Sequence, residues 1–408
     1  MKKTTSPDEE KLPADFEPSN LTNGGNNLEH LKIPLHDIKL ATGNFSPSYR
    51  VRVRDDAPCT LYKAELNHFD KENPSTKRKN KAKRQKKHIN AIIKRIHQGR
   101  EEEFFKELEV LTSVKHCNIV TLLGFCVEGF EMILVIENLS NGPLFSHLGR
   151  VNNMGTFTWA KRLKICIEVA QALDYLHTET EDKRTIVSRD IHSSNIWLDE
   201  NWRAKIVDFW GSEFLPSNQD EALIPLGIAG IPFHADPEYM FTDKLRREVD
   251  VYSFGVVLLE ILCGKAANDQ IYLKESNKGL SFVARRAYCT GTLQKMIDPM
   301  INDETSENSF NLNKGPNKDS LHTFIEIAYK CVAKTQDHRP TMKVIVNELQ
   351  KALCFQVSRT TFLVTSYYIL IPRGKMHYIL FDKAQADFHS KVLSSNGYGL
   401  YCANSLHF

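Results

Sequence analysis

The stretch SRDIHSSNIWLDENWRAKIVDFWG, residues 188–211, carries the pattern that decides the fold. It places Asp190, Asn195 and Asp208 beside short apolar runs that are typical of buried strands. Carboxylate and amide oxygens that converge at strand ends form the kind of pocket that Mg²⁺ prefers. The segment therefore predicts a magnesium site built from these three residues.

Strand and helix signals alternate around this segment in an uneven order. TLYKAEL, INAIIKRI and EMILVIEN are expected to be strands, and most of the chain after residue 137 reads as helix. Strands with one helix followed by mostly helices predict an α+β fold in two lobes. The expected helices are Ile33–Phe45, Arg100–His116, Trp159–His177, Asp250–Cys263 and Tyr329–Leu353.

Glu107 lies on the apolar stripe of the helix expected over Arg100–His116. The stripe contains Phe104, Leu108 and Leu111, so the carboxylate faces partly inward. A buried anion is tolerated only beside a cation or several hydrogen-bond donors. The sequence must therefore supply a partner for Glu107.

Composition limits the classes of protein to which the chain can belong. Its 408 residues are 41% hydrophobic and 25% charged, which excludes a collagen, a coiled coil and a multi-span transporter. The nine cysteines form no CxxC pair and read as reduced core residues. Residues 71–87 hold nine Lys or Arg against one Glu, so the basic excess is local and no nucleic-acid partner is expected.

The chain shows no sequence signal for a membrane span or for secretion. A spanning helix needs about 20 predominantly apolar residues, and the runs here are shorter or interrupted by polar residues. The first residues lack the apolar region of a secretory signal. We therefore expect a cytoplasmic protein without a transmembrane segment, and peripheral association with the inner face of the plasma membrane stays open.

Several motifs resemble those of the eukaryotic protein kinase family, and in particular those of the plant receptor-like cytoplasmic group. The similarity covers residues 33–353 and implies a two-lobed protein kinase fold, with a small β-rich N-lobe that holds one helix and a larger helical C-lobe. The motifs are ATGNFS at 41–46, HCNIVTLLGFC at 116–126, DPEY at 236–239, DVYSFGVVLLEIL at 250–262 and HRPTM at 338–342.

The resemblance assigns catalytic roles to Lys94, Glu107 and Asp190. Lys94 matches the strand lysine that contacts the α- and β-phosphates of ATP, and Glu107 matches its helix partner. Lys94 thus supplies the cation that the stripe requires. Asp190 matches the residue that orients the substrate hydroxyl and accepts its proton.

The same resemblance implies two cofactors, ATP and Mg²⁺. Asn195 and Asp208 match the residues that hold the metal ion on the phosphates. Ile136 matches the gatekeeper, and Glu137 to Leu139 match the hinge that binds adenine through backbone groups.

The phosphate loop departs from the family pattern. Its three glycine positions are occupied by Arg54, Asp56 and Cys59. Glycine lets backbone N–H groups approach a phosphate closely, and Asp56 adds a negative charge beside it. We expect a weakened affinity for ATP, partly offset by Arg54.

The catalytic motifs depart as well. Ser188 replaces the histidine of the HRD motif and leaves a gap beneath Phe209, whereas Trp210 replaces the glycine of DFG and fixes that loop in a single pose. His192 replaces the lysine of the catalytic loop, so the stabilisation of the transition state should weaken.

Two ion pairs of the C-lobe are expected from the resemblance. Glu238 of DPEY and Arg339 of HRPT match the structural pair of the family. Arg189 matches the arginine that receives a phosphate from the activation segment. We expect Asp220 or Glu221 to serve it as a permanent anion.

The activation segment offers few sites for phosphorylation. Between Asp208 and Glu238 the hydroxyl side chains are those of Ser212 and Ser217, and Ile231 stands where the family usually has threonine.

The chain is divided as follows. Residues 1–30 are expected to be a flexible leader, 31–136 the N-lobe with a basic loop insertion at 71–88, 137–353 the hinge and C-lobe, and 354–408 a tail of unknown structure. The tail contains the strand-like runs FLVTSYYILI and KMHYILFD.

These features predict an ATP-dependent serine/threonine protein kinase of the plant receptor-like type, with reduced activity, whose partner is a protein substrate or another kinase. The alternative is a pseudokinase that acts as a scaffold or allosteric partner of an active receptor kinase. A third hypothesis is a nuclear or membrane adaptor that works through residues 71–87, for which a solvated loop is the favoured interpretation.

Overall fold

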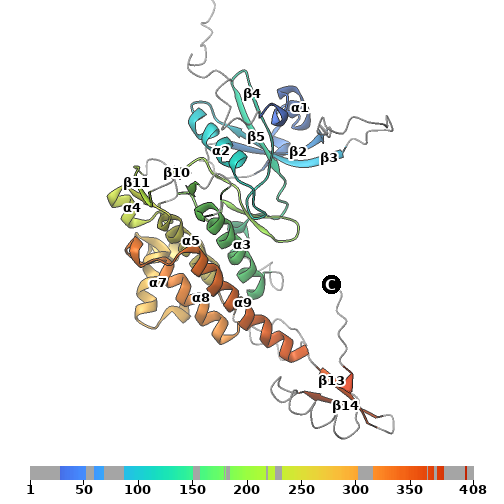
Figure 1. Cartoon of the computed structure of the whole chain (residues 1–408), viewed down its shortest axis with the longest axis vertical. Helices are drawn as coiled ribbons and strands as arrows, with labels where there is room; N and C mark the ends of the chain where they lie inside the picture. The colour runs from blue at the N-terminus through green and yellow to red at the C-terminus, as the bar shows by residue number, and fades with distance from the viewer. Residues whose placement is uncertain are drawn as a thin grey trace, which may run out of the picture. The chain divides into compact units, whose positions relative to one another are not determined.

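The computed structural model describes residues 28–51, 59–68, 87–149, 157–178, 180, 184–216, 219–225, 232–301, 316–364, 366–371, 375–380 and 400–401. Contacts divide the chain into two compact units, residues 1–115 with 120–139 and residues 116–119 with 140–408. The first unit holds an antiparallel sheet and the second is mostly helical (Figure 1). The expected α+β class is confirmed.

The first unit is built on a five-stranded antiparallel sheet. The strand order is β1-β2-β3-β5-β4, so β3 is the central strand. β4 is irregular between Leu122 and Gly124, where the register with β5 shifts. The strands are β1 (Arg50–Val51), β2 (Cys59–His68), β3 (Lys87–Ile96), β4 (Leu122–Glu128) and β5 (Glu131–Glu137).

Two helices cover opposite faces of this sheet. Alternate strand residues point to opposite faces, and Ile93 of β3 packs with Ile38 of α1 (Leu35–Ala41) in one core cluster. Lys94, the next residue of β3, therefore points to the other face, where it contacts Glu107 of α2 (Glu101–Ser113). β3 and α2 lie close to where the sequence predicts them.

The hairpin of β2 and β3 is longer than the sequence indicated. Pairing continues to Asn67 opposite His88 and His68 opposite Lys87. β3 therefore includes the last two residues of the predicted insertion 71–88, because the ladder extends past the apolar part of the strand. Residues 71–86 of that insertion lie outside the described residues.

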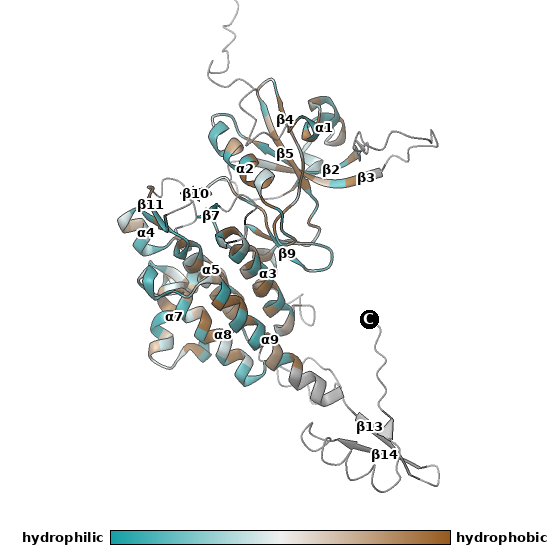
Figure 2. Ribbon diagram, viewed as in Figure 1, coloured by the Kyte–Doolittle hydropathy of each residue, from teal (hydrophilic) through white to brown (hydrophobic). Residues whose placement is uncertain are grey.

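The second unit packs around α5 (Glu248–Cys263). Every residue of α5 after Glu248 is buried, as its continuous apolar pattern predicts. Other helices carry one apolar side, and α8 and α9 alternate hydrophobic and hydrophilic positions along their length (Figure 2). These helices are α3 (Trp159–Thr178), α4 (Pro237–Thr242), α6 (Gln270–Leu273), α7 (Gly279–Cys289), α8 (Lys318–Cys331) and α9 (Met342–Val364).

Short strand pairs hold the loops of the second unit. β8 pairs with β6 and β9, β7 pairs with β10, and β11 pairs with β12, all antiparallel. β8 and β9 lie within residues 188–211, and β7 and β10 lie on either side of that segment. The strands are β6 (Gly142–Pro143), β7 (Thr185–Val187), β8 (Ile196–Leu198), β9 (Ala204–Ile206), β10 (Glu213–Leu215), β11 (Glu221–Leu223) and β12 (Lys244–Arg246).

The expectation of one closing helical segment over Tyr329–Leu353 is wrong. α8 ends at Cys331, a 3₁₀ turn spans Gln336–His338, and α9 begins at Met342. Pro340 explains the break, because proline lacks the backbone N–H that a helix interior needs.

The elements beyond residue 353 extend the helix and add a small sheet. α9 continues to Val364, and β13 (Ser366–Ile371) pairs with β14 (Lys375–Leu380) and β15 (Leu400–Tyr401). The two strand-like runs of the tail therefore include strands, although Phe362–Val364 belongs to α9.

The structure bears on two expectations from the sequence, that the cysteines are reduced core residues and that no helix spans a membrane. All cysteines of the described ranges are free thiols, but Cys117, Cys289 and Cys354 are exposed rather than core residues. In the part of the chain that the structure describes, no helix combines the length and apolarity needed to cross a membrane.

Candidate active site

Lys94 and Glu107 form a buried ion pair in the first unit. Lys94 lies between Leu61 of β2 and Leu134 of β5, so the sheet fixes its backbone on both sides. Its Nζ is 2.5 Å from Glu107 Oε2, and the two side chains are 4% and 0% exposed. A carboxylate this deeply buried requires a cation, and the contact is the one that the stripe of α2 demanded.

The residues that follow β5 are held by backbone and side-chain contacts. Glu137 donates its N–H to Thr121 O at 3.1 Å, and Glu137 Oε1 accepts the N–H of Thr121 at 2.7 Å. Ile136 is buried next to Ile92 of β3, and Leu139 is buried as the last residue of the first unit. The segment expected to bind adenine thus has a fixed backbone.

Asp250 ties the loop before Asp190 to helix α5. Asp250 Oδ2 accepts the N–H of Ser188 at 2.8 Å and contacts His177 Nε2 at 3.0 Å, while Oδ1 accepts the N–H of Arg189 at 2.9 Å. Arg189 adopts a left-handed conformation with φ +62°, which costs a non-glycine residue about 1–2 kcal/mol. These hydrogen bonds hold the loop in that conformation.

Both carboxylate oxygens of Asp190 are oriented by neighbouring side chains. Asn195 Nδ2 donates to Asp190 Oδ2 at 3.0 Å and to Asp190 O at 3.2 Å. His192 Nε2 lies 3.2 Å from Asp190 Oδ1. The structure therefore brings Asp190 and Asn195 together, as the sequence pattern predicts.

Asp208 lies at the same end of the β8–β9 hairpin as Asn195. Asn195 precedes β8 and Asp208 follows β9, and Val207 donates its N–H to Asn195 O at 3.1 Å. Because Asn195 Nδ2 is directed at Asp190, its amide oxygen lies on the other side of the amide carbon. An amide oxygen and a carboxylate suit Mg²⁺, which takes one or two protein ligands together with phosphates. Among the described residues, no three His, Cys, Asp or Glu side chains form a metal site.

A group of buried polar side chains adjoins His192. The ring centroids of His192 and His234 are 5.8 Å apart, and His234 Nε2 lies 3.2 Å from Glu260 Oε2. Glu260 Oε1 accepts the N–H of Ala267 at 2.8 Å. Burial raises the pKa of Glu260, but the nearby His234 and hydrogen bonds from Ala267 and Ser193 outweigh burial and hold the pKa below its usual value.

Among the described residues, the positions that depart from the kinase pattern occupy ordinary backbone conformations. Trp210 is half-buried in a turn closed by the N–H of Ser212 on Phe209 O at 3.0 Å. It is absent from the residues with positive φ, so the lost glycine leaves no backbone strain. Ser188 is fully buried, and Cys59 starts β2 as a buried residue. Arg54 and Asp56 lie outside the described residues.

The expectation that Asp220 or Glu221 serves Arg189 is wrong. Arg189 contacts Glu213 of β10 at 3.3 Å, whereas Asp220 pairs with Arg247 at 2.5 Å and Glu221 contacts Lys244 at 3.7 Å. The pairing of β10 with β7 explains the difference, because it places Glu213 opposite Val187, two residues before Arg189.

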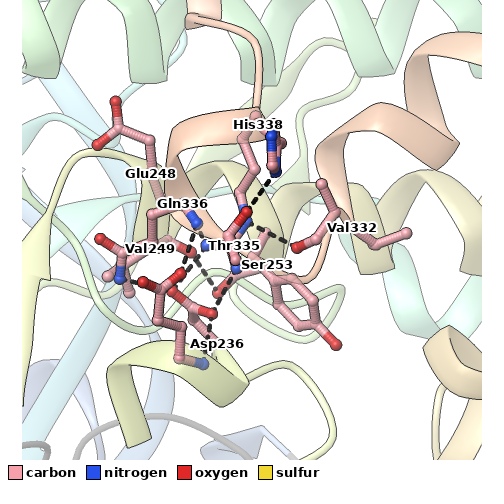
Figure 3. A network of polar contacts seen from close by, with 12 residues as sticks. Asp236, Glu248, Val249, Ser253, Val332, Thr335, Gln336 and His338 are labelled. Atoms are coloured by element: carbon pink, nitrogen blue, oxygen red, sulfur yellow. Dashed lines mark hydrogen bonds and ion pairs between the residues drawn. The ribbon is translucent and has the colours of Figure 1, made fainter. Parts of the chain in front are cut away.

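The expected pair of Glu238 with Arg339 is also wrong. Arg339 Nη1 and Nη2 donate to the two oxygens of Asp236 at 2.7 and 2.6 Å, and both side chains are 0% exposed. Glu238 Oε2 instead accepts the N–H of Gln336 at 2.5 Å. Figure 3 shows Asp236 at the centre of this network, beside Gln336. Asp236 is the N-cap of α4, and its Oδ1 also accepts the N–H of Glu238 at 3.0 Å.

Sequence reasoning missed three functional carboxylates: Asp236, Glu213 and Asp250. Asp250 carried a usable signal, since an aspartate on a helix that is apolar on nearly every face needs partners for the same reason as Glu107. Asp236 before Pro237 signals a helix N-cap, but not the arginine that binds it. Glu213 carried no local signal.

An antiparallel sheet with a buried lysine–glutamate pair, followed by a helical unit that holds an oriented aspartate, defines the protein kinase fold. Residues 74–349 match the family described as protein tyrosine and serine/threonine kinase. The chain belongs to this family.

Its relatives include receptor-like kinases of Arabidopsis thaliana. A probable receptor-like protein kinase is 39% identical over 62% of this chain and 29% of its own length. The receptor-like protein kinase HERK 1 is 34% identical over 80% of this chain and 35% of its own length. The receptor-like protein kinase FERONIA is 36% identical over 63% of this chain and 27% of its own length. The chain thus spans about a third or less of the length of these curated relatives.

Proposed function

We propose that this chain is a serine/threonine protein kinase that transfers the γ-phosphoryl group of ATP to hydroxyl groups of a protein. The observation that carries the proposal is the orientation of Asp190. Its two carboxylate oxygens face Asn195 and His192, and its loop is bonded to Asp250 of the buried helix α5. A base with a fixed position and direction is what proton acceptance from a hydroxyl requires.

Each candidate residue has one role in this proposal. Asp190 orients the substrate hydroxyl and takes its proton, Lys94 binds the α- and β-phosphates, and Glu107 holds Lys94 in place. The backbone of Glu137 and Leu139 receives adenine. Asn195 and Asp208 would hold Mg²⁺, which when bound neutralises charge on the transferring phosphoryl group.

A pseudokinase scaffold is the second candidate function. The observation in its favour is the absence of glycine from the phosphate-loop positions, which are Arg54, Asp56 and Cys59. His192 in place of lysine acts in the same direction, because lysine carries a permanent charge toward the γ-phosphate. The proposed kinase is therefore slow rather than fully active.

Transfer of label from γ-labelled ATP to a generic basic protein tests the two candidates against each other. Asp190→Asn is the control, because it keeps the size of the side chain and removes the base. We expect slow transfer by the wild type and at least a hundredfold less by the control, the scale of general-base catalysis at about 10²–10⁴. Equal rates in both proteins would contradict the proposal.

Nucleotide binding separates the alternatives when transfer is not detected. A ligand at 100 times its dissociation constant stabilises a protein by about 2.7 kcal/mol. We expect Mg-ATP to raise the melting temperature of the wild type and of Asp190→Asn alike. A wild type that melts at the same temperature with and without Mg-ATP would favour the scaffold.

We extend the proposal to location and partners. The protein acts in the cytoplasm, with peripheral contact at the inner face of the plasma membrane, and its partner is a protein substrate or another kinase. Support comes from the receptor-like relatives and from the basic residues between β2 and β3. A fluorescent fusion with and without residues 71–86 tests the membrane contact, which loss of peripheral signal in the deletion would support.

A further inference from the structure

Arg189, the residue before Asp190, is held by groups from the segment that follows Asp208. Its Nη1 donates to Glu213 Oε1 at 3.3 Å and its Nη2 donates to Pro225 O at 2.9 Å. The guanidinium lies over the ring of Tyr239 at 5.7 Å from the centroid. The arginine side chain is only 6% exposed, so these contacts take the place of water around its charge.

Strand pairing determines which carboxylate reaches Arg189. β10 pairs with β7 so that Glu213, Phe214 and Leu215 oppose Val187, Ile186 and Thr185. Val187 and Leu215 also pack with Tyr239, Leu245 and Val249 in one buried cluster. The position of Glu213 is therefore fixed by the sheet and by the core, not by the ion pair alone.

The two described hydroxyl side chains of this segment, those of Ser212 and Tyr239, are poorly placed to accept a phosphate. Ser212 is 0% exposed and its Oγ donates to Ser188 O at 3.5 Å. Tyr239, at the end of the segment, is 0% exposed and its hydroxyl donates to Ile224 O at 2.8 Å. Ser217 is the other hydroxyl between Asp208 and Glu238, and it lies outside the described residues.

We propose that Glu213 is a positioning residue: it is the built-in counter-ion of Arg189, and it holds the segment after Asp208 on the catalytic loop without phosphorylation. The inference rests on the proposed kinase function. A phosphoserine creates charge-assisted hydrogen bonds to arginine only after modification, whereas a glutamate supplies its carboxylate from synthesis onward. The activity of this chain is therefore independent of the phosphorylation of this segment.

Charge changes at Glu213 test the positioning role. Glu213→Gln should lower kcat about tenfold, equivalent to about 1.4 kcal/mol, with the KM for ATP unchanged, and Glu213→Lys should lower kcat further. The same replacements at Glu221 are matched controls on the next strand. Glu221 is 54% exposed and 3.7 Å from Lys244, so its loss should change kcat less than about twofold. Equal effects at both positions, or none at either, would overturn the proposal.

Two further measurements complete the test. Phosphatase treatment, checked by mass spectrometry of residues 208–238, should leave the transfer rate of the wild type unchanged. A dephosphorylated wild type that loses activity would overturn the proposal. Hydrogen exchange of the Glu213–Leu215 amides is read without catalysis, and it should accelerate in Glu213→Lys but not in Glu221→Lys. Accelerated exchange in Glu213→Lys, together with a wild type that shows no transfer activity, would refute the kinase function and retain the positioning role.

Discussion

Replacing Asp236 tests which carboxylate carries the buried pair with Arg339. Asp236→Asn keeps the helix cap, because asparagine and aspartate cap helices equally well, but it leaves the guanidinium without its anion. Both side chains are 0% exposed and the pair is bidentate, at 2.6 and 2.7 Å. Breaking a buried pair in this way costs about 3–5 kcal/mol. Glu238→Gln removes the negative charge but keeps an amide oxygen that accepts the same backbone N–H, so we expect a cost of no more than about 1 kcal/mol.

A double-mutant cycle with Arg339→Gln makes the comparison direct. Urea unfolding followed by circular dichroism gives the free energy of unfolding of each variant. We expect a coupling energy of about 2 kcal/mol or more between Asp236 and Arg339, and of less than about 0.5 kcal/mol between Glu238 and Arg339. The reverse ranking would refute the assignment and restore the pair that the family resemblance predicts.

Two other changes have effects whose direction follows from the structure. Gly264→Ala should destabilise by about 3 kcal/mol or more, because Gly264 has φ +64° and the new Cβ would meet the carboxylate of Asp298, which is paired with Arg162 at 2.6 Å. Gly291→Ala, with φ +69° and no heavy atom within 4 Å of the added Cβ, should cost about 1–2 kcal/mol in the same unfolding assay, and equal costs would contradict the role of Asp298. Burial raises the pKa of Glu168 above its ordinary 4.5, so the folded state binds that proton more tightly and loses stability as the pH rises above 4.5. Glu168→Gln should therefore gain stability relative to the wild type as the pH rises above 4.5, and a difference that does not change with pH would show the assignment to be wrong.

Periodicity predicted the parts of the fold that are set by local pattern. The stripe of α2 required a cation for Glu107, and Lys94 fills that need at 2.5 Å. The continuous apolar run of α5 predicted a buried helix, and the segment from Asp190 to Asp208 predicted the β8–β9 hairpin that brings its polar ends together. These predictions succeed because neighbours along the chain determine which face is buried.

Contacts between distant residues were beyond the sequence pattern. Asp236 and Glu238 are two positions apart, and both were plausible partners for Arg339, which is 103 residues away from Asp236. The choice depends on the cap position of Asp236. There its carboxylate binds both the N–H of Glu238 and the guanidinium of Arg339, whereas Glu238 lies within the first turn of α4. Likewise, Glu213 reaches Arg189 through the register of two three-residue strands. Strands this short carry too few residues to show a period.

The attachment of the catalytic loop to Asp250 bears on how far its motif can diverge. Asp250 binds the main-chain N–H groups of Ser188 and Arg189, which every residue except proline possesses. Substitution of a side chain at position 188 therefore leaves the attachment intact. Position 188 can therefore change during evolution while Asp190 keeps its orientation. An unusual residue at that position of the motif is for this reason a poor indication of whether the catalytic loop is intact.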